Sequence, residues 1–584
     1  MAPRRFSVRG RINALTVVLV LLLGAVGARA FTLQGLEHAK FVRLADSKQQ
    51  GTIPLPAQRG DILDRRGFRL ASTETAVLVG ATLSQIRDRP LVAGLVAQYA
   101  HVDRTRVLGL LATRGAVYVE LAHGVSRIDA GRLQARLAAL DAKLPPARRS
   151  SGLSYTPEDQ RVYPSTVASQ VVGSMGHTGA AAFPVGLNGV EARWESQLRG
   201  RPGSERVVRD IDGRVIRTVS QVAAADGRTL ALAIDRDIQS FAEKLIDGAV
   251  DTTRAKNGTA MVMDTQTGAV LAIASTSARK GKGATTVGRA LRAVTEQYEP
   301  GSTFKPVTIA AALSEHKVTP KTKIDVPSTY TFYDVTLHDA ESHGDEVLSI
   351  ADILRVSSNI GTVRTAMQYL SGPGGCQFVN RCGQDLRKWI ARFGFGHATG
   401  VDLAGEIAGS VLPPDHWSGT SILNVPIGQG IAVTPIQLAT LYATIANGGV
   451  RTTPYVVDRV DGRPVPRSKG RRIISKRVAG QLTSMLQHVV SERGTGALAA
   501  VPGYSVAGKT GTAQKIDPRT GRYSDTDYGA WFVGFAPARH PRIVALVMID
   551  GAAGATHQGG AIAAPVFSQL VGRALSVLGV PKSE

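Results

Sequence analysis

GYSVAGKTGTAQKIDPRTGRYSDTDYGAWFVGF, residues 503–535, is compatible with two different folds. Its first eight residues satisfy the phosphate-loop pattern G-x-x-x-x-G-K-[ST], and a later apolar run, IVALVMID, ends at Asp550, an acid that a magnesium site would need. A phosphate loop must follow a buried strand and open a helix. This one follows Pro502 and leads into DPRTGR, a turn signal, and then AWFVGF, a strand signal. The stretch therefore predicts strand, hairpin, strand rather than a nucleotide site.

The N-terminus predicts that most of the chain lies outside the cytoplasm. Four arginines precede 17 uncharged residues, Ile12 to Ala28, a length at the short end for a membrane-spanning helix. The arginines assign the first residues to the cytoplasm. Ala28-Arg29-Ala30 also fits the cleavage pattern of a signal peptide, but the continuation AFTLQGLEHAKFVRL favours one long helix and an anchor. Because ATP is scarce outside a cell, either alternative argues against a nucleotide-dependent enzyme.

The composition is that of a large globular protein. The chain has 584 residues, 43% of them hydrophobic, and a net charge of +23. That charge favours anionic surroundings, but the basic residues are dispersed and match no nucleic-acid motif, so a solvated surface is the simpler interpretation. The only cysteines, Cys376 and Cys382, lie in a Gly-rich segment and could close a small disulfide loop, with two free thiols as the alternative.

A change of pattern near residue 226 predicts a domain boundary. Before it, VSRIDAGRLQARLAALDAKL predicts a helix and GRPGSERVVRDIDGRVI a hairpin. After it, TLALAIDRDIQSFAEKLIDGAV predicts a strand running into an amphipathic helix, and GTAMVMDTQTGAVLAIAS predicts two strands joined by a turn. We therefore expect a cytoplasmic tail at 1–11, an anchor at 12–30, and two extracytoplasmic regions at 31–225 and 226–578.

A nucleophilic serine needs a base within reach, and Ser-x-x-Lys on a helix supplies one because residues three apart share a face. The pattern occurs three times, at Ser277 and Lys280, at Ser302 and Lys305, and at Ser314 and Lys317. The first copy lies in a Gly- and Lys-rich loop, and the third lies at a helix end. Only Ser302 lies between a Pro-Gly turn and an apolar helix, where the helix N-terminus favours a developing oxyanion.

Two further motifs occur once each, Ser357-Ser358-Asn359 and Lys509-Thr510-Gly511. The ordered trio SxxK, SxN and KTG is the active-site signature of penicillin-binding proteins and serine β-lactamases. RGDILDRRGFRLAS, residues 59–72, resembles the box that opens the extracytoplasmic module of class B penicillin-binding proteins, and GQGIAVTPIQLATLYATIANGG and GGAIAAPVF are also similar to that family. The chain most resembles the septal, cell-division member, with the elongation-specific member as the closest alternative.

The resemblance implies an α+β protein. The region 226–578 would be a penicillin-binding, serine β-lactamase-like transpeptidase domain, with an antiparallel sheet flanked by helices. The region 31–225 would be an elongated α+β pedestal or dimerisation domain, preceded by the transmembrane helix. The apolar run into Asp550 would be a core strand near the end of the sheet. The protein would cross the cell (inner) membrane once, with its N-terminus in the cytoplasm and its catalytic domain outside.

The resemblance also implies a monofunctional peptidoglycan D,D-transpeptidase. Ser302 would attack the carbonyl of the penultimate D-Ala of a stem pentapeptide, release the terminal D-Ala and pass the acyl group to an amine of a neighbouring stem peptide. β-Lactams would acylate the same serine. Lys305 must be neutral to accept a proton, which requires burial and a nearby like charge, and Lys509 is our candidate for that charge. The identity of the base is disputed in this superfamily.

The roles of the other motif residues follow from the hydrogen bonds or protons that each can donate and from the space that each leaves for the substrate. The first serine of SxN would relay a proton to the leaving amine, and the asparagine would hold the lysine and contact the substrate amide. The Lys-Thr pair suits the terminal carboxylate of the substrate, and the glycine lets the substrate backbone approach the strand. The expected residues are Ser302, Lys305, Ser357 and Asn359 for catalysis, the backbone N–H groups of Ser302 and Thr512 for the oxyanion hole, and Lys509, Thr510, Gly511 and Thr512 for substrate binding.

No cofactor is expected. HDAESHGDE, residues 338–346, crowds two histidines with four acids, but its spacing fits no helical metalloprotease motif, and we interpret it as a polar loop ahead of the SxN helix. Besides the two stem peptides and β-lactams, the family implies a membrane-embedded glycan polymerase and other divisome proteins as partners, with no nucleic acid and no nucleotide. A carboxypeptidase or β-lactamase, which transfers to water, and a non-catalytic division scaffold are the alternatives.

Overall fold

The structure, a computed structural model, falls into two compact units: residues 1–58 with 200–227, and residues 59–199 with 228–584. The residues that it describes are 8–37, 40, 50–55, 57–145, 148–150, 152–176, 178, 184–209, 215–278, 291–371, 383–517, 519–554 and 556–582.

The smaller unit holds the N-terminal helix and a three-stranded sheet. Helix α1, Val8–Phe31, continues as a π-helix, Thr32–Leu36, so the long helix expected beyond Ala28 is confirmed as far as Leu36. This segment is long and apolar enough to cross a membrane, and none of it is buried. The sheet has the order β1-β8-β9, and the predicted hairpin is the antiparallel pair β8 and β9. The strand bounds are Gln50–Leu55 for β1, Gly203–Arg209 for β8 and Val215–Val222 for β9.

The first part of the larger unit is a mixed sheet with the order β19-β18-β10-β2-β3-β4, to which β5 is added by pairing with β3. The sheet draws strands from both sides of residue 226, so one sheet spans the two predicted extracytoplasmic regions. The bounds are Ile62–Leu63 (β2), Arg69–Thr82 (β3), Tyr118–Val125 (β4), Leu153–Val162 (β5), Leu230–Leu232 (β10), Val457–Val460 (β18) and Arg463–Pro464 (β19).

Three helices surround a small core beside β3 and β4. Each follows an N-cap residue whose side chain accepts a backbone N–H of the first turn, which is the ordinary way to satisfy the free donors there; the N-cap residues are Asp88, Asp103 and Ser126. The helix predicted from VSRIDAGRLQARLAALDAKL is confirmed as α5. The bounds are Arg89–Ala100 (α3), Arg104–Leu111 (α4) and Arg127–Asp141 (α5), with shorter elements at Leu83–Gln85 (η2), Ser169–Val172 (α6), Met175–Gly176 (β6), Val185–Gly186 (β7), Gly189–Arg193 (α7) and Glu195–Leu198 (α8).

The second part of the larger unit is built on an antiparallel sheet with the order β12-β11-β23-β22-β21. The predicted strand, hairpin, strand is confirmed as β21 and β22, and the KTG motif lies within β21 rather than at the start of a helix. The expectation that IVALVMID lies near the end of the sheet is wrong, because β23 is the central strand. All eight of its residues are buried, which is why it reads as a continuous apolar run. The bounds are Asn257–Asp264 (β11), Val270–Ser277 (β12), Ala507–Ile516 (β21), Tyr523–Ala536 (β22) and Ile543–Asp550 (β23).

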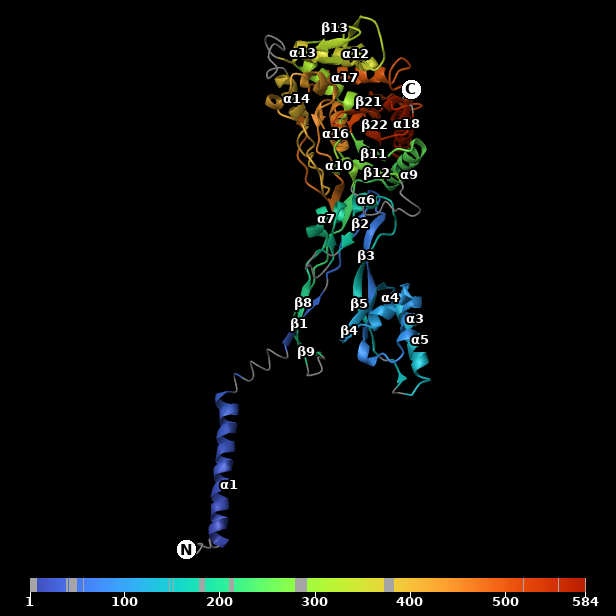
Figure 1. The fold of residues 1–584 in the computed structure, drawn as a ribbon. Helices are drawn as coiled ribbons and strands as arrows, with labels where there is room; N and C mark the ends of the chain where they lie inside the picture. Colours follow the sequence, from blue (N-terminus) through green and yellow to red (C-terminus); the bar gives the residue numbers. More distant parts are fainter. Residues whose placement is uncertain are drawn as a thin grey trace. The chain divides into compact units, whose positions relative to one another are not determined.

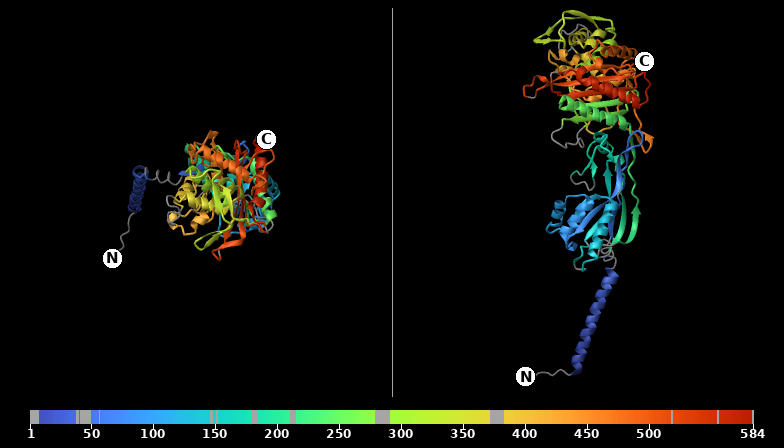
Figure 2. Two further views of the ribbon diagram at one scale, coloured as in Figure 1. Left: turned by 90° about the horizontal axis from the view of Figure 1, so that it is seen from above. Right: turned by 90° about the vertical axis from the view of Figure 1, so that its right-hand side faces the viewer.

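Helices cover both faces of this sheet (Figure 1). Helices α9, Arg236–Thr253, and α18, Gly559–Val577, pack together on one face, and α16, Pro435–Ala446, packs on the other. Figure 2 shows strands from the middle of the chain beside strands from its end. Helix α18 is also apolar enough to cross a membrane, but it is partly buried against β22 and β23 and is a core helix.

The remaining elements of the larger unit are short helices, 3₁₀ turns and strand pairs. The helices are Arg292–Thr295 (α10), Lys305–Ser314 (α11), Ile350–Val356 (α12), Asn359–Tyr369 (α13), Gln384–Phe393 (α14), Ser421–Asn424 (α15) and Lys476–Val489 (α17), with 3₁₀ turns at Gly301–Phe304 (η4), Pro414–His416 (η6), Val425–Ile427 (η7) and Ala497–Ala499 (η8). Short strand pairs are Lys323–Val326 with Glu346–Ser349 (β13, β16), Tyr330–Phe332 with Val335–Leu337 (β14, β15) and Val450–Arg451 with Arg471–Arg472 (β17, β20).

Candidate active site

Ser302 lies in the 3₁₀ turn η4, which leads directly into α11. Two glycines allow this turn to approach its neighbours. Gly301 has φ +52°, and its N–H donates to the carbonyl oxygen of Gly428 at 3.0 Å. A Cβ on Gly428 would lie 2.2 Å from the Gly301 carbonyl oxygen, so that position has no room for a side chain. These contacts fix the turn against the residue that follows η7, and a Cβ on Gly301 would lie 3.0 Å from the Thr512 carbonyl oxygen, so the turn also lies close to β21.

Lys305 connects the SxxK motif with the SxN motif. Its side chain is completely buried, and Nζ donates to the Ser357 carbonyl oxygen at 2.5 Å, to Ser357 Oγ at 3.2 Å and to Asn359 Oδ1 at 2.8 Å. Burial lowers the pKa of Lys305 to about 7, against the opposing effect of the Asp339 carboxylate. A large fraction of this lysine is therefore neutral near pH 7 and able to accept a proton.

Ser357 is held in an unusual backbone conformation. It ends α12 with φ +63°, a region that costs a residue with a side chain of order 1 kcal/mol or more. Ser358 follows it as the N-cap of α13 and accepts the Gly361 N–H at 2.8 Å. The left-handed residue turns the chain so that both Ser357 oxygens face Lys305.

Asp339, in the loop 338–346, is a site residue that sequence reasoning missed. Its Oδ1 accepts the backbone N–H groups of Asn359 and Ile360, and its Oδ2 accepts from Ser358 Oγ at 2.6 Å and lies 3.1 Å from His343 Nε2. The carboxylate thus caps the helix that carries Asn359. An acid suits a helix N-terminus, but Asp339 lies 20 residues before Asn359 in the sequence, too far for a local capping pattern to reveal it.

The loop 338–346 is otherwise polar and exposed for much of its length. No group of three or more His, Cys, Asp or Glu side chains that could hold a metal ion occurs among the described residues. Cys376, Cys382 and Lys280 lie outside the described residues.

Strand β21 supplies the opposite wall of the site. Thr510 Oγ1 lies 2.8 Å from Thr495 Oγ1, and Thr512 Oγ1 accepts the Gly559 N–H at 3.1 Å. A Cβ on Gly511 would lie 2.7 Å from Thr303 Cγ2 and 3.0 Å from the Pro300 carbonyl oxygen. Gly511 is therefore required for packing of the turn that carries Ser302 against the strand, a reason that the sequence alone did not reveal.

Lys509 belongs to β21, but its side chain does not line the cleft. It is completely buried, and Nζ donates to the Thr510 carbonyl oxygen and to Thr510 Oγ1, both at 3.3 Å. Burial lowers the pKa of Lys509 well below its ordinary value, and the like charge of Lys305 adds to this. We expected Lys509 to depress the pKa of Lys305. In the structure burial is the largest cause at both lysines, and the repulsion between their like charges belongs to the pair.

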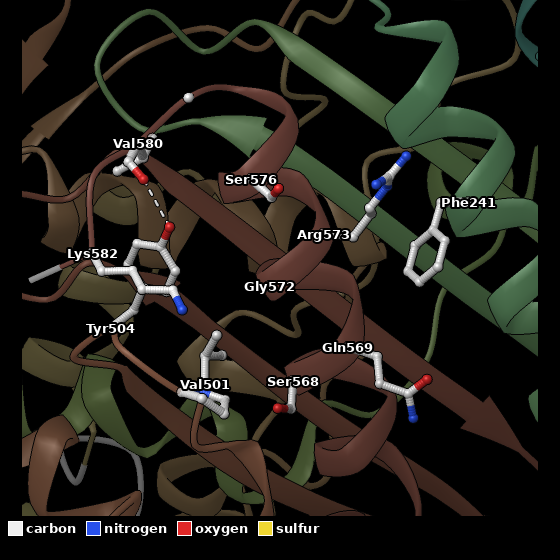
Figure 3. Close-up of a pocket in the computed structure, with 12 residues that line it drawn as sticks. Phe241, Val501, Tyr504, Ser568, Gln569, Gly572, Arg573, Ser576, Val580 and Lys582 are labelled. Atoms are coloured by element: carbon white, nitrogen blue, oxygen red, sulfur yellow. Dashed lines mark hydrogen bonds between the residues drawn. The ribbon is translucent and has the colours of Figure 1, made fainter.

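These residues surround a cleft of about 350 Å³. Its lining includes six of the eight predicted site residues, with Asp339, His343 and Thr495 in addition; the six are Ser302, Ser357, Asn359, Thr510, Gly511 and Thr512. The two buried lysines lie behind it. A separate hollow (Figure 3) lies between α9, the residues before β21, helix α18 and the residues after it, where Tyr504 Oη donates to the Val580 carbonyl oxygen at 2.7 Å. That hollow contains none of the predicted site residues.

Comparisons with known proteins agree with this architecture. The family described as penicillin binding protein transpeptidase domain matches residues 258–572, and the family described as penicillin-binding protein dimerisation domain matches residues 54–232. The penicillin-binding protein PbpB of Mycolicibacterium smegmatis is 34% identical, covering 99% of this chain and 91% of its own. The peptidoglycan D,D-transpeptidase FtsI of Escherichia coli is 30% identical, covering 98% and 92%.

A solved structure gives the same result at the level of the fold. The crystal structure of penicillin binding protein 3 from Mycobacterium tuberculosis, complexed with aztreonam, has a TM-score of 0.67 and 30% identity, and the match covers 91% of this chain and 98% of that one. The α+β fold class is thereby confirmed, with a transpeptidase domain, a dimerisation domain and an apolar N-terminal helix. The chain belongs to the class B penicillin-binding proteins.

Proposed function

We propose that this chain is a peptidoglycan D,D-transpeptidase that acts through an acyl-enzyme on Ser302. The observation that carries the proposal is the environment of Lys305, a buried amine with a pKa of about 7 whose three hydrogen bonds join the SxxK and SxN motifs. A lysine in this state suits a general base acting on a neighbouring serine.

The proposed reaction has two transfers. Ser302 Oγ loses its proton to Lys305 and bonds to the carbonyl carbon of the penultimate D-Ala, while the N–H groups of Ser302 and Thr512 stabilise the oxyanion. The C–N bond to the terminal D-Ala breaks, and the proton passes from Lys305 through Ser357 to the leaving amine. An amine of a second stem peptide then attacks the ester and loses a proton to the same groups. Ser302 regains its proton as the C–O bond breaks.

The terminal carboxylate of the donor is assigned to the Thr510 end of the cleft. The hydroxyls of Thr510 and Thr495 line the cleft there, and Lys509 lies behind Thr510. An anion in this position favours the protonated form of Lys509, so its charge appears when the ligand binds. The carboxylate of a β-lactam would use the same contacts.

The proposal also covers the membrane topology of the protein and its protein partners. Helix α1, behind a run of arginines, supports a single membrane pass with the N-terminus in the cytoplasm. The similarity to PbpB and FtsI supports a role in cell division. A membrane-embedded glycan polymerase and other divisome proteins are proposed as partners because the family resemblance of the sequence implies them. We keep the boundaries 31–225 and 226–578 for the two extracytoplasmic domains.

The test is intact mass after incubation with a fluorescent penicillin. We expect one stable adduct on the wild type and none on Ser302→Ala. Ser314→Ala, which alters another copy of the SxxK motif, is the matched control and should be labelled like the wild type. A labelled Ser302→Ala protein would overturn the assignment of the nucleophile. Rapid loss of the adduct from the wild type would favour a β-lactamase, and complementation of a depletion strain by Ser302→Ala would favour a non-catalytic scaffold.

A further inference from the structure

His343 lines the cleft, and both of its ring nitrogens face oxygen atoms. Nδ1 lies 2.7 Å from the Gly344 carbonyl oxygen and 3.6 Å from Glu346 Oε1, and Nε2 lies 3.1 Å from Asp339 Oδ2. The side chain is 20% exposed, so water reaches the ring only in part. The reaction proposed above assigns no role to this histidine.

The oxygens around the ring indicate which protonation state of His343 fits the site. A carbonyl oxygen and an ionised carboxylate can only accept hydrogen bonds. A neutral imidazole carries one N–H, so its other nitrogen would turn a lone pair toward one of these acceptors. The imidazolium ion has an N–H on each nitrogen and donates to both Gly344 and Asp339. The geometry therefore fits a positively charged His343.

The surrounding charges favour the same state. The ionisable groups that line the cleft with His343 or interact with it are all acidic and belong to its own loop; they are Asp339, Glu341, Asp345 and Glu346. The other elements that line the cleft contribute no histidine, lysine, arginine or carboxylate among the described residues. The Gly344 carbonyl and the Asp339 and Glu346 carboxylates raise the pKa of His343, against the opposing effect of desolvation.

Asp339 connects this charge with the catalytic groups. Its carboxylate accepts the backbone N–H of Asn359 at the start of α13, and Asn359 Oδ1 accepts from Lys305 Nζ at 2.8 Å. The same carboxylate raises the pKa of Lys305. A proton on His343 therefore affects Lys305 in two ways. It holds the carboxylate that caps α13, and it offsets the negative charge that keeps a proton on Lys305.

We propose that protonated His343 is a positioning residue for the acylation of Ser302. Its imidazolium binds Asp339 and thereby orients Asn359, which holds Lys305. This inference rests on the function proposed above, in which Lys305 is the base. Lys305 acts without its extra proton and His343 acts with its own, so the two groups respond to pH in opposite directions. Loss of the proton from Lys305 speeds the reaction as pH rises, and loss of the proton from His343 slows it.

The experiment measures the rate at which a fluorescent penicillin labels the full-length protein in detergent, between about pH 6 and about pH 9. In His343→Gln an amide N–H can still donate to Asp339, but the side chain has no charge. In His343→Lys the charge persists throughout this range. The rate of the wild type is divided by the rate of each variant at each pH, because pH effects that the proteins share cancel in this ratio.

We expect the wild type to react about 10-fold faster than His343→Gln at about pH 6, as the loss of one charge-assisted hydrogen bond predicts. The ratio should fall to about 1 or below at about pH 9, because His343 then loses its proton while the glutamine continues to donate. His343→Lys should react within about 3-fold of the wild type at about pH 6 and faster than the wild type at about pH 9.

The matched control is His338→Gln. It makes the same change in the same loop, at an exposed side chain that does not line the cleft. The rate of this variant should stay within about 2-fold of the wild-type rate at every pH, because an exposed side chain without a role in the site contributes little.

The outcomes separate this inference from the proposed function. A ratio of wild type to His343→Gln that does not change with pH overturns the inference, whatever its size, because a purely structural role of His343 would lower the rate equally at each pH. A His343→Lys variant as slow as His343→Gln at about pH 6 also overturns it. In both cases labelling of the wild type still supports the transpeptidase. Absence of penicillin labelling in the wild type contradicts the proposed function itself.

Discussion

Two buried clusters of charged groups in the described part of the chain are built on opposite principles. In the first part of the larger unit, Glu191 is completely buried and accepts from Arg59 Nε and Arg161 Nε, both at 2.7 Å, while Arg59 also pairs with Glu195 at 2.7 Å. Burial alone would lower the pKa of Arg59, but its hydrogen bonds and charge interactions with Glu195 and Glu191 raise it.

In the active site two lysines are buried with one carboxylate near them. Lys305 and Lys509 are both completely buried, and the pKa of each is lowered. The first cluster, called here the paired cluster, consists of Arg59, Arg161, Glu191 and Glu195; it keeps its charges and holds chain segments together. The second, called here the lysine cluster, consists of Lys305, Lys509 and Asp339. Its lysines are more easily deprotonated, so Lys305 can accept a proton near neutral pH. The comparison shows that buried charged groups are stabilised only where groups of opposite charge pair with them. A buried amine that lacks such a pair is deprotonated more easily, which is the state that a general base requires.

The largest effect is expected from Lys305→Met, which separates chemistry from stability. Without its base, labelling of the protein by penicillin should fall about 10³-fold or more. The unfolding midpoint in urea should not fall, because an apolar side chain of similar length replaces a desolvated amine. Lys317→Met, at an exposed position of another SxxK copy, should label normally. Labelling of Lys305→Met at the wild-type rate would disprove the role of Lys305 as base.

The paired cluster should respond in the opposite way. Glu191→Ala leaves two arginines buried without their shared carboxylate, and we expect a loss of about 3–5 kcal/mol of unfolding free energy. Urea denaturation followed by circular dichroism measures this. Glu74→Ala, at an exposed position on β3, should change stability by less than about 0.5 kcal/mol. If the two variants unfold alike, the cluster does not stabilise the fold.

Asp339→Asn tests the single carboxylate of the lysine cluster. The labelling rate of the wild type should rise with pH through about pH 7, because neutral Lys305 is the reactive form. Asp339 raises the pKa of Lys305, so removing its charge should move the midpoint of this rise to lower pH. The rate itself should fall about 10-fold, since the cap of α13 is weakened. Asp345→Asn, in the same loop, should keep the wild-type midpoint, and an unchanged midpoint in Asp339→Asn would contradict the coupling.

The smallest effect is expected from Thr495→Val. This change removes the hydroxyl that lies 2.8 Å from Thr510 Oγ1, at the place assigned to the substrate carboxylate. Losing one hydrogen bond of about 0.5–1.5 kcal/mol predicts a 3- to 10-fold slower reaction with penicillin. Thr483→Val, on α17 and bonded only to its own helix carbonyl in the described structure, is the control. Equal rates for both variants would show that the Thr495 hydroxyl does not contribute to the reaction with penicillin.

Much of the fold was predictable because the relevant signals are local. The strand, hairpin, strand at residues 503–535 follows from the turn DPRTGR between two strand-forming runs, and the helix α5 follows from a segment rich in Ala, Leu and Arg, which are strong helix formers. The position of β23 was mispredicted because an apolar run indicates burial but not which strands lie beside it. Asp339 was missed because its hydrogen bonds to α13 span about 20 residues, which include β16 and α12 and follow no local capping pattern.

The sequence by itself determined the chemistry that is available, since a serine with a lysine three residues later, and the SxN and KTG triplets, are local patterns of reactive side chains. Only the tertiary structure decided how they act together. Lys305 reaches Ser357 and Asn359 across 52 and 54 residues, and its pKa falls because helices and sheet exclude water around it. The physical reason is that burial and long-range pairing arise when the whole core packs, and no short segment contains that information.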